Sequence, residues 1–373
     1  MVREIKYIGF YNLPNNGKKR VSSLAATNKI DYICDVMVRA GYGVSLISPS
    51  WIEGKGIDYV KKIQLAEFKR VTFFPSIGSN NKIRNYISIV ISLSWLFFYL
   101  ILNAKKGEKV VVYHSPWIAL PLILSKRIKK FKLVLEVEEV YSDVSSLHKI
   151  FDKFEKKVFE CSDYFLFSTD LLSKKINKNR PFLVLYGSYN VPKKMSNPPN
   201  DGKIHLIYAG IIDSHKAGAF NAIETALYLN DNYIIHVIGF GEIAKLEKRI
   251  LEINKISKCK VFYEGIKQGD EYIEFCQSCH IGLSTQNIEG AYTESSFPSK
   301  ILSYLSMGLN VVSGDISCVK KSKVSSLVTF YKGDSKNIAA SILTIDMKSS
   351  EYITSEIKKI GVDFENEIKN IID

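Results

Sequence analysis

A proline-containing turn before a predicted helix forms one candidate anion site. Residues 296–312 read SFPSKILSYLSMGLNVV. Pro298 suits the first turn of a helix, and Ser296 or Ser299 can cap it. The free backbone N–H groups at such a start, together with the positive end of the helix dipole, attract an anion. Because Gly308 ends the helix and a buried strand follows at once, we expect the helix start to be held rigidly beside a sheet.

Carboxylates crowd the end of another predicted strand. Residues 133–143 read LVLEVEEVYSD, and Glu138 and Glu139 stand at the carboxyl end of the hydrophobic run. Mutual repulsion raises the pKa values of clustered carboxyl groups toward a range that is useful in catalysis. We therefore expect Glu138 or Glu139 to orient or deprotonate an acceptor hydroxyl. The alternative is a solvated acidic loop paired with nearby lysines.

His114 is a third candidate for catalysis. It ends the predicted strand 110–114 and is followed by Ser and Pro. Ligands of open α/β sheets bind outside the carboxyl ends of the strands, so this position places His114 at the edge of a cleft. A structural role for a lone histidine at a strand end is the alternative.

The elements that must position these residues alternate along the whole chain. Short β-branched and aromatic runs are separated by helical stretches, which predicts parallel sheets covered on both faces. The predicted fold class is α/β, with two Rossmann-like doubly wound parallel-sheet domains that face an interdomain cleft. The predicted strands are 5–11, 43–48, 109–114, 132–137, 164–168, 182–185, 204–209, 233–238, 260–263, 281–284 and 310–313.

The boundary between the domains is predicted from length and composition. A chain of 373 residues is about right for two domains. The stretch 190–203, NVPKKMSNPPNDGK, is rich in Pro, Asn, Lys and Gly, which is typical of a linker. We assign residues 1–192 to the N-terminal domain, 193–203 to the linker and 204–348 to the C-terminal domain. Residues 349–373 are predicted to form a helix that can pack back on the N-terminal domain.

The segment around Pro298 resembles the donor-binding stretch of GT-B glycosyltransferases, especially family 4 (group 1). The usual form there is close to F-P-x-K-x-x-E-Y-L-x-x-G-x-P-V-V, and this chain is similar to it as a divergent member. The resemblance implies that Ser296, Pro298 and Ser299 lie at the turn that binds the donor diphosphate. Phe297 and Lys300 match the same stretch and are donor-binding candidates with them.

The chain departs from the family pattern at two glutamates that contact the sugar and the ribose. Ser303 stands where the ribose-binding glutamate is usual, and Ser295 stands at the other position. Glu294, one residue earlier, is the candidate replacement. The resemblance to family 4 implies retention at the anomeric centre, whereas a carboxylate base would allow inversion, and both stay open.

A second match opens the C-terminal half. Residues 208–218 read YAGIIDSHKAG and resemble the family's Y-x-G-R…K-G element, with Gly210 as its glycine. The family neutralises the diphosphate with an Arg and a Lys, of which Lys216 fits the Lys while Ile211 takes the Arg position. A cation there stabilises the negative charge that develops on the leaving nucleoside diphosphate. A surface lysine before a helix is the alternative.

Further turns match the family more weakly. Gly239 and Gly241 follow a strand and open a helix, as in the family's G-x-G element, although any tight turn of this kind favours glycine. Gly265 and Ile266 resemble the turn whose backbone groups bind the nucleobase. In the loop after the first strand, Gly17 and Arg20 are candidates on the acceptor side, and a plain surface loop is the alternative.

The sequence predicts a reaction without a metal ion. No D-x-D triplet occurs in the chain, and enzymes that hold a diphosphate through a metal commonly use one. We therefore expect Lys216 and the helix start to neutralise the diphosphate instead. No metal and no cofactor beyond the nucleotide-sugar substrate are predicted.

Charge and composition bear on compartment and partners. The net charge is +13, from 51 Lys and Arg against 38 Asp and Glu, which favours contact with anions, a solvated basic surface being the alternative. Six cysteines form no disulfide framework, and no signal peptide is recognised, so we expect a cytoplasmic protein. Residues 86–104 carry no charge, and we expect a helix that is buried or lies on the bilayer interface rather than a span.

These features predict a metal-independent glycosyltransferase. It would move a hexose from a UDP- or GDP-linked donor, bound by the C-terminal domain, to a saccharide held by the N-terminal domain. The acceptor is expected to be linked to a lipid carrier, in bacterial O-antigen, capsular or exopolysaccharide synthesis at the inner face of the membrane, with peripheral contact to anionic lipid. The alternatives are a nucleotide-sugar epimerase of the same fold and, in another class, a non-catalytic basic protein that binds nucleic acid. The latter would need a basic stripe interleaved with exposed aromatic residues, which the sequence lacks.

Overall fold

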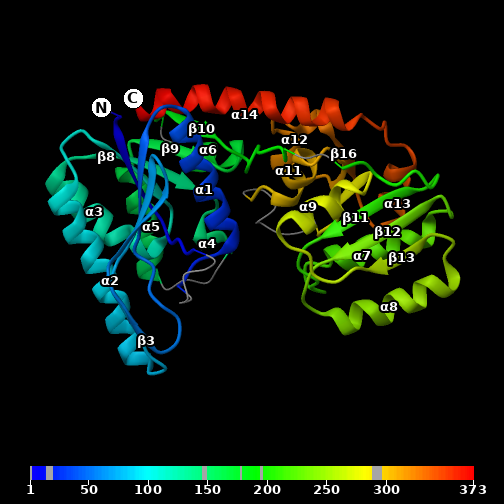
Figure 1. Cartoon of the computed structure of the whole chain (residues 1–373), viewed down its shortest axis with the longest axis horizontal. Helices are drawn as coiled ribbons and strands as arrows, with labels where there is room; N and C mark the ends of the chain where they lie inside the picture. Colours follow the sequence, from blue (N-terminus) through cyan, green and yellow to red (C-terminus); the bar gives the residue numbers. More distant parts are fainter. Residues whose placement is uncertain (1, 14–19, 145–148, 177–178, 194–195, 288–295) are drawn as a thin grey trace. The chain divides into compact units, whose positions relative to one another are not determined.

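The computed structural model describes residues 2–13, 20–144, 149–176, 179–193, 196–287 and 296–373. It divides the chain into two compact units (Figure 1). The N-terminal unit comprises Met1–Ser188 and Asp363–Asp373, and the C-terminal unit comprises Tyr189–Val362. The division therefore falls a few residues before the linker that the composition predicts.

An eight-stranded sheet forms the centre of the N-terminal unit. Its order is β10-β9-β8-β7-β1-β2-β5-β4, and all neighbouring strands are parallel except β4 and β5. The strands are β1 (Glu4–Ile8), β2 (Gly43–Ser48), β4 (Lys61–Ala66), β5 (Lys69–Phe73), β7 (Lys109–Tyr113), β8 (Lys132–Val137), β9 (Tyr164–Phe167) and β10 (Phe182–Val184). A separate antiparallel pair joins β3 (Gly56–Asp58) to β6 (Ser76–Gly78). The predicted strands do not include β3 to β6. β3, β4 and β6 lack the apolar runs of buried strands, whereas β5 carries a short one, in which Val71 and Phe73 are fully buried.

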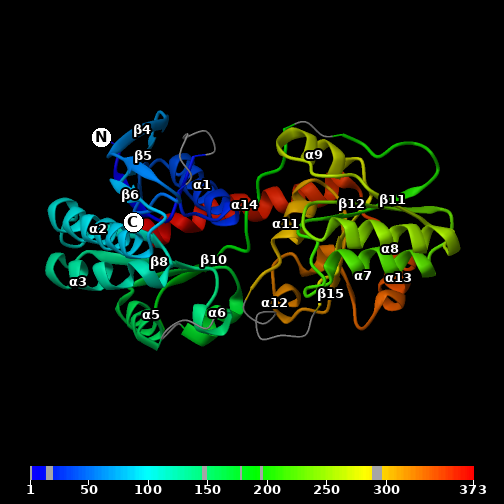
Figure 2. The same cartoon turned by 90° about the horizontal axis from the view of Figure 1, so that it is seen from below.

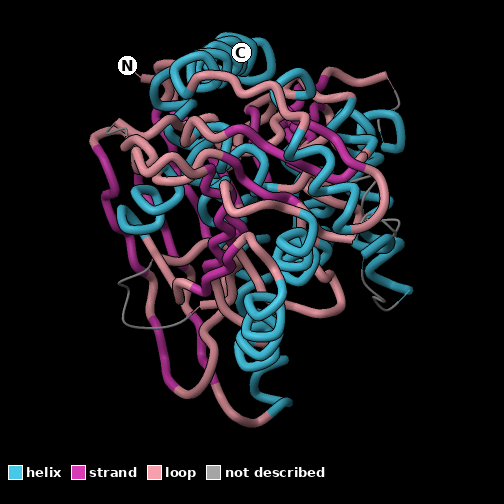
Figure 3. The backbone as a smooth tube through the Cα atoms, turned by 90° about the vertical axis from the view of Figure 1, so that its right-hand side faces the viewer, coloured by secondary structure: helices cyan, strands magenta, loops and turns pink. Residues whose placement is uncertain are grey.

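Helices surround this sheet, and polar side chains fix where two of them begin. Ser23 Oγ accepts the N–H of Ala26 at 3.0 Å, and Asn81 Oδ1 accepts the N–H of Ile83 at 2.9 Å. The helices are α1 (Leu24–Arg39), α2 (Lys82–Asn103), α3 (Ala119–Lys129), α4 (Tyr141–Val144), α5 (Lys149–Cys161) and α6 (Asp170–Ile176). Figure 3 marks them along the backbone tube.

By length and composition alone, one helix of this unit is apolar enough to cross a membrane. The candidate span is Ile83–Asn103 within α2, with a mean hydropathy of 1.9. Leu96 and Leu100 nevertheless pack into the hydrophobic core of the N-terminal unit with Leu122 of α3. Only 22% of the apolar window is buried in the structure, and its other side chains are partly or fully exposed.

The C-terminal unit contains a six-stranded parallel sheet. Its order, β13-β12-β11-β14-β15-β16, reads 3-2-1-4-5-6 in chain order, which is the strand order of the Rossmann fold. The strands are β11 (Ile204–Ala209), β12 (Tyr233–Ile238), β13 (Lys260–Tyr263), β14 (Ile281–Ser284), β15 (Asn310–Gly314) and β16 (Val328–Tyr331). The sequence predicts the first five and omits the four-residue β16. Both sheets confirm the predicted α/β, Rossmann-like fold class.

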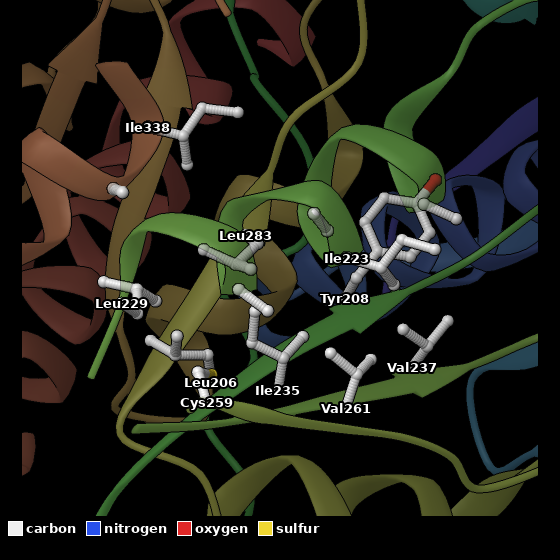
Figure 4. Close-up of a cluster of buried hydrophobic side chains, with 14 of the residues drawn as sticks. Leu206, Tyr208, Ile223, Leu229, Ile235, Val237, Cys259, Val261, Leu283 and Ile338 are labelled. Atoms are coloured by element: carbon white, nitrogen blue, oxygen red, sulfur yellow. The ribbon is translucent and has the colours of Figure 1, made fainter. Parts of the chain in front are cut away.

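Apolar side chains on one face of the sheet pack against helices and form a hydrophobic core of this unit. The helices are α7 (Gly218–Glu224), α8 (Ile243–Ile256), α9 (Gly269–Gln277), α11 (Ser299–Ser306), α12 (Ser317–Lys320) and α13 (Ser335–Leu343). Strand side chains pack against Ile223 of α7 and Ile338 of α13 (Figure 4). The strand residues labelled there are Leu206, Tyr208, Ile235, Val237, Val261 and Leu283.

The last helix contributes to both units. α14 spans Ser350–Ile372, and its residues from Asp363 onward belong to the N-terminal unit. On the N-terminal unit, Glu365 Oε2 lies 2.8 Å from Nε of Arg39. The buried apolar residues of this last part of the helix recur at helical spacing and are Phe364, Ile368, Ile371 and Ile372.

A buried arginine holds three segments of the N-terminal unit together. The side chain of Arg20 is fully buried, and its Nε and Nη2 lie 3.0 and 2.7 Å from Oδ2 of Asp58. It also donates to the carbonyl oxygens of Ser50 and Phe74, the latter at 2.8 Å. Its guanidinium is thus occupied within the fold, which corrects the expectation that Arg20 faces the acceptor. Gly17, the other candidate in this loop, lies outside the described residues.

We expect Arg20→Met to destabilise the N-terminal unit strongly. The substitution leaves the carboxylate of Asp58, which is 2% exposed, buried beside only the partly exposed Lys61. Removing one member of a buried ion pair costs about 3–5 kcal/mol of unfolding free energy, measurable by urea denaturation. The control is Arg39→Met, which breaks a partly exposed pair with Glu365 and should cost less than about 1 kcal/mol. Equal effects of the two substitutions would contradict the structural role of Arg20.

Candidate donor-binding site

Two glycine-containing turns bring the carboxyl ends of β11 and β12 into backbone contact. Gly210 N donates to Ile238 O at 3.0 Å. Gly239 has φ of +142°, and a Cβ on it would lie 1.8 Å from Gly210 O. Only glycine can occupy this position, because backbone atoms cannot move aside as a side chain can. The next turn follows the same pattern, since Gly241 pairs in an isolated bridge with Ile212.

The side chain of Lys300 lies in the space that Gly210 leaves open. A Cβ on Gly210 would be 2.5 Å from Cε and 2.8 Å from Nζ of Lys300. The Lys300 ammonium donates to the hydroxyl oxygen of Tyr208 at 2.7 Å, and that hydroxyl donates to Ile211 O at 3.0 Å. The motif glycine therefore positions a cation directly at the end of the central strand.

The cation of Lys300 is poorly solvated and stands near a second cation. Burial and, as the smaller cause, the charge of Lys216 together lower the pKa of Lys300 to about 7. Within the described ranges, neither lysine forms an ion pair with a carboxylate. Lys216 itself is exposed. Two neighbouring ammonium groups, one of them desolvated, form a site that an anion would stabilise.

These lysines lie at the topological switch point of the Rossmann sheet. β11 is hydrogen-bonded to β12 on one side and to β14 on the other. The loop after β14 is tied to the loop that carries Lys216, because Asn287 N donates to Lys216 O at 2.9 Å. Thr285 Oγ1 likewise donates to Gly218 O at 2.7 Å. Ligands of open α/β sheets bind at this point.

The start of α11 supplies uncapped backbone donors. Pro298 occupies the position before the helix, with φ −67° and ψ 107°, and no side chain caps the first turn. The expectation that Ser296 or Ser299 caps this helix is therefore wrong. Ser299 is exposed, and Lys300 follows it in the first turn. Unpaired N–H groups at a helix start, beside two lysines, suit a phosphate group.

The other predicted donor residues have mixed surroundings. Phe297 is 7% exposed and thus packs inward, and Ser296 O accepts from Sγ of Cys318 at 3.5 Å. Gly265 O accepts the N–H of Gly239 at 2.9 Å, which places this turn next to the two glycine turns. Ile266, beside it, is 54% exposed. Glu294 lies outside the described residues.

The carboxylates predicted to act in catalysis lie in the N-terminal unit, around the carboxyl end of β8. Glu138 forms an ion pair with Lys29 of α1, whose Nζ also donates to Leu185 O at 2.9 Å. Glu136 is fully buried and accepts from the Tyr7 hydroxyl, and the Glu138 side chain lies near enough to affect its charge state. Burial raises the pKa of Glu136 to about 8, against the pull of Lys29, with the charge of Glu138 as a further cause. The cluster thus combines a neutral carboxyl group with a lysine-paired one.

His114 and Glu139 lie beside this cluster. His114 is 2% exposed, and its Nε2 is 3.4 Å from Oε1 of the buried Glu155. Burial lowers the pKa of His114 to about 3, so the ring is neutral at physiological pH. This burial favours the structural alternative over a residue at a cleft edge. Glu139 is half-buried.

Sequence reasoning missed three of the residues that make up these two sites. Tyr208 stands in the YAG element but carries no expected role, and its contact with Lys300 depends on how β11 and α11 pack. Lys29 is one lysine among many, and only the docking of α1 brings it to Glu138. Of these three residues, only Glu136 could have been recognised from the sequence, because an acidic residue inside an apolar strand is unusual. Within the described residues, no group of three or more His, Cys, Asp or Glu side chains could hold a metal ion.

No family model matches the sequence, and no curated protein matches it either. Solved structures do match along the whole chain. An α,α-trehalose-phosphate synthase (UDP-forming) from Burkholderia xenovorans in complex with glucose-6-phosphate superposes with a TM-score of 0.62 and 9% identity, over 99% of each chain. Anabaena HepE in complex with UDP and glucose gives 0.61 and 10%, also over 99% of each chain.

A third similar structure comes from a plant. The catalytic domain of Arabidopsis thaliana starch synthase IV, bound to ADP and acarbose, gives a TM-score of 0.63 and 7% identity over 100% of this chain and 98% of that chain. The likeness in all three cases is one of fold. Two Rossmann-like units matched over their full length to glycosyltransferases define the GT-B fold for this chain.

Binding of a nucleoside diphosphate should take up a proton near neutral pH. With a pKa of about 7, Lys300 is partly neutral in the free protein, whereas a bound diphosphate favours its charged form. Affinity for UDP or GDP is therefore highest below this pKa and falls as pH rises through it, by up to about tenfold between about pH 7.5 and 8.5. Calorimetry in buffers of different ionisation enthalpy measures the proton uptake.

The control for this prediction is Lys300→Met. The variant should bind more weakly and show a flat pH dependence in the same range, where phosphate, with a second pKa near about 6, is already ionised. A pH dependence as steep as that of the unaltered protein would show that another group takes up the proton.

We expect Glu136→Gln to stabilise the N-terminal unit in alkaline solution. The pKa of Glu136 is raised to about 8 from an ordinary 4.5, so its ionisation costs free energy only in the folded state. The neutral form of Glu136 contributes its full stability below the pKa that this group has in the unfolded state. That contribution is lost as pH rises through the pKa of the group in the folded state. The glutamine variant should melt about 2–4 °C higher near pH 9 and equally near pH 5. Exposed Glu160→Gln should show no such pH-dependent gain.

Proposed function

We propose that this chain is a glycosyltransferase that uses a nucleoside-diphosphate hexose, linked to UDP or GDP, as its donor. The observation that carries the proposal is the pair Lys216 and Lys300 at the switch point of the C-terminal sheet. A desolvated ammonium hydrogen-bonded to Tyr208, next to a second ammonium and an uncapped helix start, suits a diphosphate. The GT-B fold places this chemistry in an architecture that similar proteins use with UDP or ADP.

The proposed reaction uses these cations on the leaving group. The bond between the anomeric carbon and the diphosphate oxygen breaks, and its electron pair leaves with the nucleoside diphosphate. Lys216 and Lys300 then face an increasing negative charge, which they stabilise more strongly in the transition state than in the ground state. We propose that no metal ion takes part in this step.

The acceptor hydroxyl must lose a proton as it forms the new glycosidic bond. Of the carboxyl groups around β8, Glu138 suits this role, because it is only partly buried at the strand end and is positioned there by its ion pair with Lys29. Glu136, whose pKa is about 8, serves in this proposal as a neutral donor that orients the Glu138 carboxylate. Glu139 is a second candidate at the same strand end.

We further propose a saccharide acceptor carried by a lipid, in bacterial O-antigen, capsular or exopolysaccharide synthesis. The protein would be cytoplasmic and peripheral at the inner face of the cell membrane. Support comes from the net charge of +13 and from the outward apolar side chains of α2, of which Leu102 is 80% and Ile83 71% exposed. Such a surface favours contact with anionic lipid.

The donor reaction can be tested with the purified protein and a panel of UDP- and GDP-hexoses. We expect one donor to release its nucleoside diphosphate, slowly with water and faster with a saccharide acceptor. Lys216→Ala should weaken binding of that nucleoside diphosphate by about 10- to 100-fold, as expected for the loss of a charged contact.

The matched control is Lys258→Ala, which removes an exposed lysine elsewhere in the same unit. It should leave binding and turnover unchanged. If no donor in the panel reacts and Lys216→Ala binds nucleotide as well as the unaltered protein does, the proposed function is wrong. Conversion of the donor to an isomeric sugar without any acceptor would instead identify an epimerase.

A further inference from the structure

For a helix in water, α2 has an unusually apolar outer surface. Its small polar residues Ser88 and Ser92 are 2% and 0% exposed, and Ser88 Oγ lies 3.1 Å from Ser76 Oγ inside the unit. Most of the exposed side chains are large and apolar, and the polar ones among them are Arg84, Ser94 and Asn103. The apolar side chains that are at least half exposed are Ile83, Tyr86, Ile87, Val90, Phe98 and Leu102. Water disfavours such a stripe.

A second apolar stripe lies beside the first. Leu120, Leu124 and Ile128 recur every four residues on α3 and are 43%, 41% and 61% exposed, which places them on one helix face. α3 packs along α2, and Figures 1 and 2 show the two helices side by side. The two stripes together form one outward apolar face of the N-terminal unit.

A basic pocket opens at the carboxyl end of α3. It has a volume of about 320 Å³, at the lower end of the range of ligand pockets. Its apolar wall is formed by Ile123, Phe131 and Cys161. The charged residues that line it are Lys126, Arg127, Lys130, Lys132 and Lys157. All belong to α3, α5 or the start of β8 and its preceding turn.

The positive charge of this pocket is only partly balanced. Lys126 and Lys132 share one carboxylate, that of Asp163, with Lys132 Nζ 3.1 Å from Oδ1. In the part of the chain that the structure describes, Arg127, Lys130 and Lys157 have no acidic partner. The pocket therefore carries several cations and one anion, and an anionic group entering it would relieve their repulsion.

The pocket and the apolar face are continuous. Arg127, which lines the pocket, is adjacent to Ile128 and one turn after Leu124 on α3. Gly107 N donates to Lys130 O at 3.0 Å, which brings the loop after α2, with exposed Lys105 and Lys106, to the same end. An apolar stripe that ends in a cationic pocket matches a phospholipid, whose acyl chains adjoin an anionic headgroup.

We propose that the pocket between α3 and α5 binds the phosphate of an anionic phospholipid headgroup while the apolar face of α2 and α3 lies in the bilayer interface. The helices do not span the bilayer, because Leu96 and Leu100 of α2 remain packed in the core. Charge selects lipid over a second copy of this chain, since two copies would bring identical cationic pockets together. This proposal adds a specific lipid contact to the proposed function. It rests on the proposed peripheral association with the membrane and not on the proposed donor reaction.

Flotation with lipid vesicles tests the proposal on the full chain. The protein should float with vesicles of phosphatidylcholine and phosphatidylglycerol and stay behind with phosphatidylcholine alone. Arg127→Gln with Lys157→Gln should lower the partition coefficient on the anionic vesicles by roughly tenfold or more, at about a fivefold loss per basic residue. Leu102→Ser with Ile128→Ser should lower it to a similar degree, because apolar area at the interface is lost.

Matched controls remove the same groups from the C-terminal unit. Lys255→Gln with Lys258→Gln takes two exposed charges, and Leu251→Ser with Ile256→Ser takes two side chains that are 66% and 76% exposed. If these controls lose vesicle binding as much as the α3 and α2 variants do, net charge or nonspecific hydrophobic adsorption explains the binding, and the proposal is wrong. It is also wrong if the Leu102 and Ile128 variants change the oligomeric state but not flotation.

A further arm separates a lipid headgroup from free phosphate. Inorganic phosphate at a concentration that fills the pocket should lower the partition coefficient no further than Arg127→Gln with Lys157→Gln does, because the apolar face remains bound; complete displacement would overturn the lipid assignment. UDP and GDP binding, measured on the same variants, should be unchanged. Loss of lipid binding with intact nucleotide binding therefore leaves the donor reaction standing, whereas failure of nucleotide binding bears on the proposed function alone.

Discussion

The candidate donor site depends on an ammonium group that the fold holds away from water without giving it a carboxylate. Lys300 reaches over Gly210 and, among the described residues, meets the hydroxyl of Tyr208 at 2.7 Å and the ring of the same residue. Burial and the like charge of Lys216 lower its pKa to about 7. A buried charge without an opposite charge is costly. Binding of an anion removes this free-energy cost. The unpaired charge of the free protein therefore increases its affinity for a phosphate.

This arrangement requires close approach of backbone segments. Gly239 lies so near Gly210 O that no side chain fits between them, and the two strand ends can therefore meet at the switch point of the sheet. A larger residue at either position would separate the turns and move the space that Lys300 occupies. The chemistry of the site thus depends on the absence of two side chains as much as on the presence of two lysines.

Two buried ionisable side chains of the N-terminal unit, Arg20 and Glu136, have different surroundings. Arg20 is surrounded by a carboxylate and backbone carbonyls and stays ionised, so it holds the segments around Asp58 and Phe74 together. Burial, together with the neighbouring charge of Glu138, favours the neutral form of Glu136, although the hydroxyl that Tyr7 donates to it favours the ionised form. Fully satisfied charges stabilise a fold, whereas a carboxyl group with a raised pKa remains available for proton transfer.

On the outside of the same unit, α2 and α3 expose apolar surface that the core does not need.

The sequence by itself determined the fold class, because alternating apolar runs and helical stretches allow little besides two doubly wound parallel sheets. It also determined the glycine turns and the helix start after Pro298, since local backbone demands select these residue types. The short strands β3, β4 and β6 and the edge strand β16 escaped prediction, because their pairing is decided by neighbours rather than by their own pattern. β5 escaped prediction although its buried Val71 and Phe73 form an apolar pattern. Only the tertiary structure decided that Arg20 is buried, that Lys29 reaches Glu138, and that Tyr208 holds Lys300. These contacts join residues far apart in the chain, and their charge states follow from burial, which no local spacing encodes.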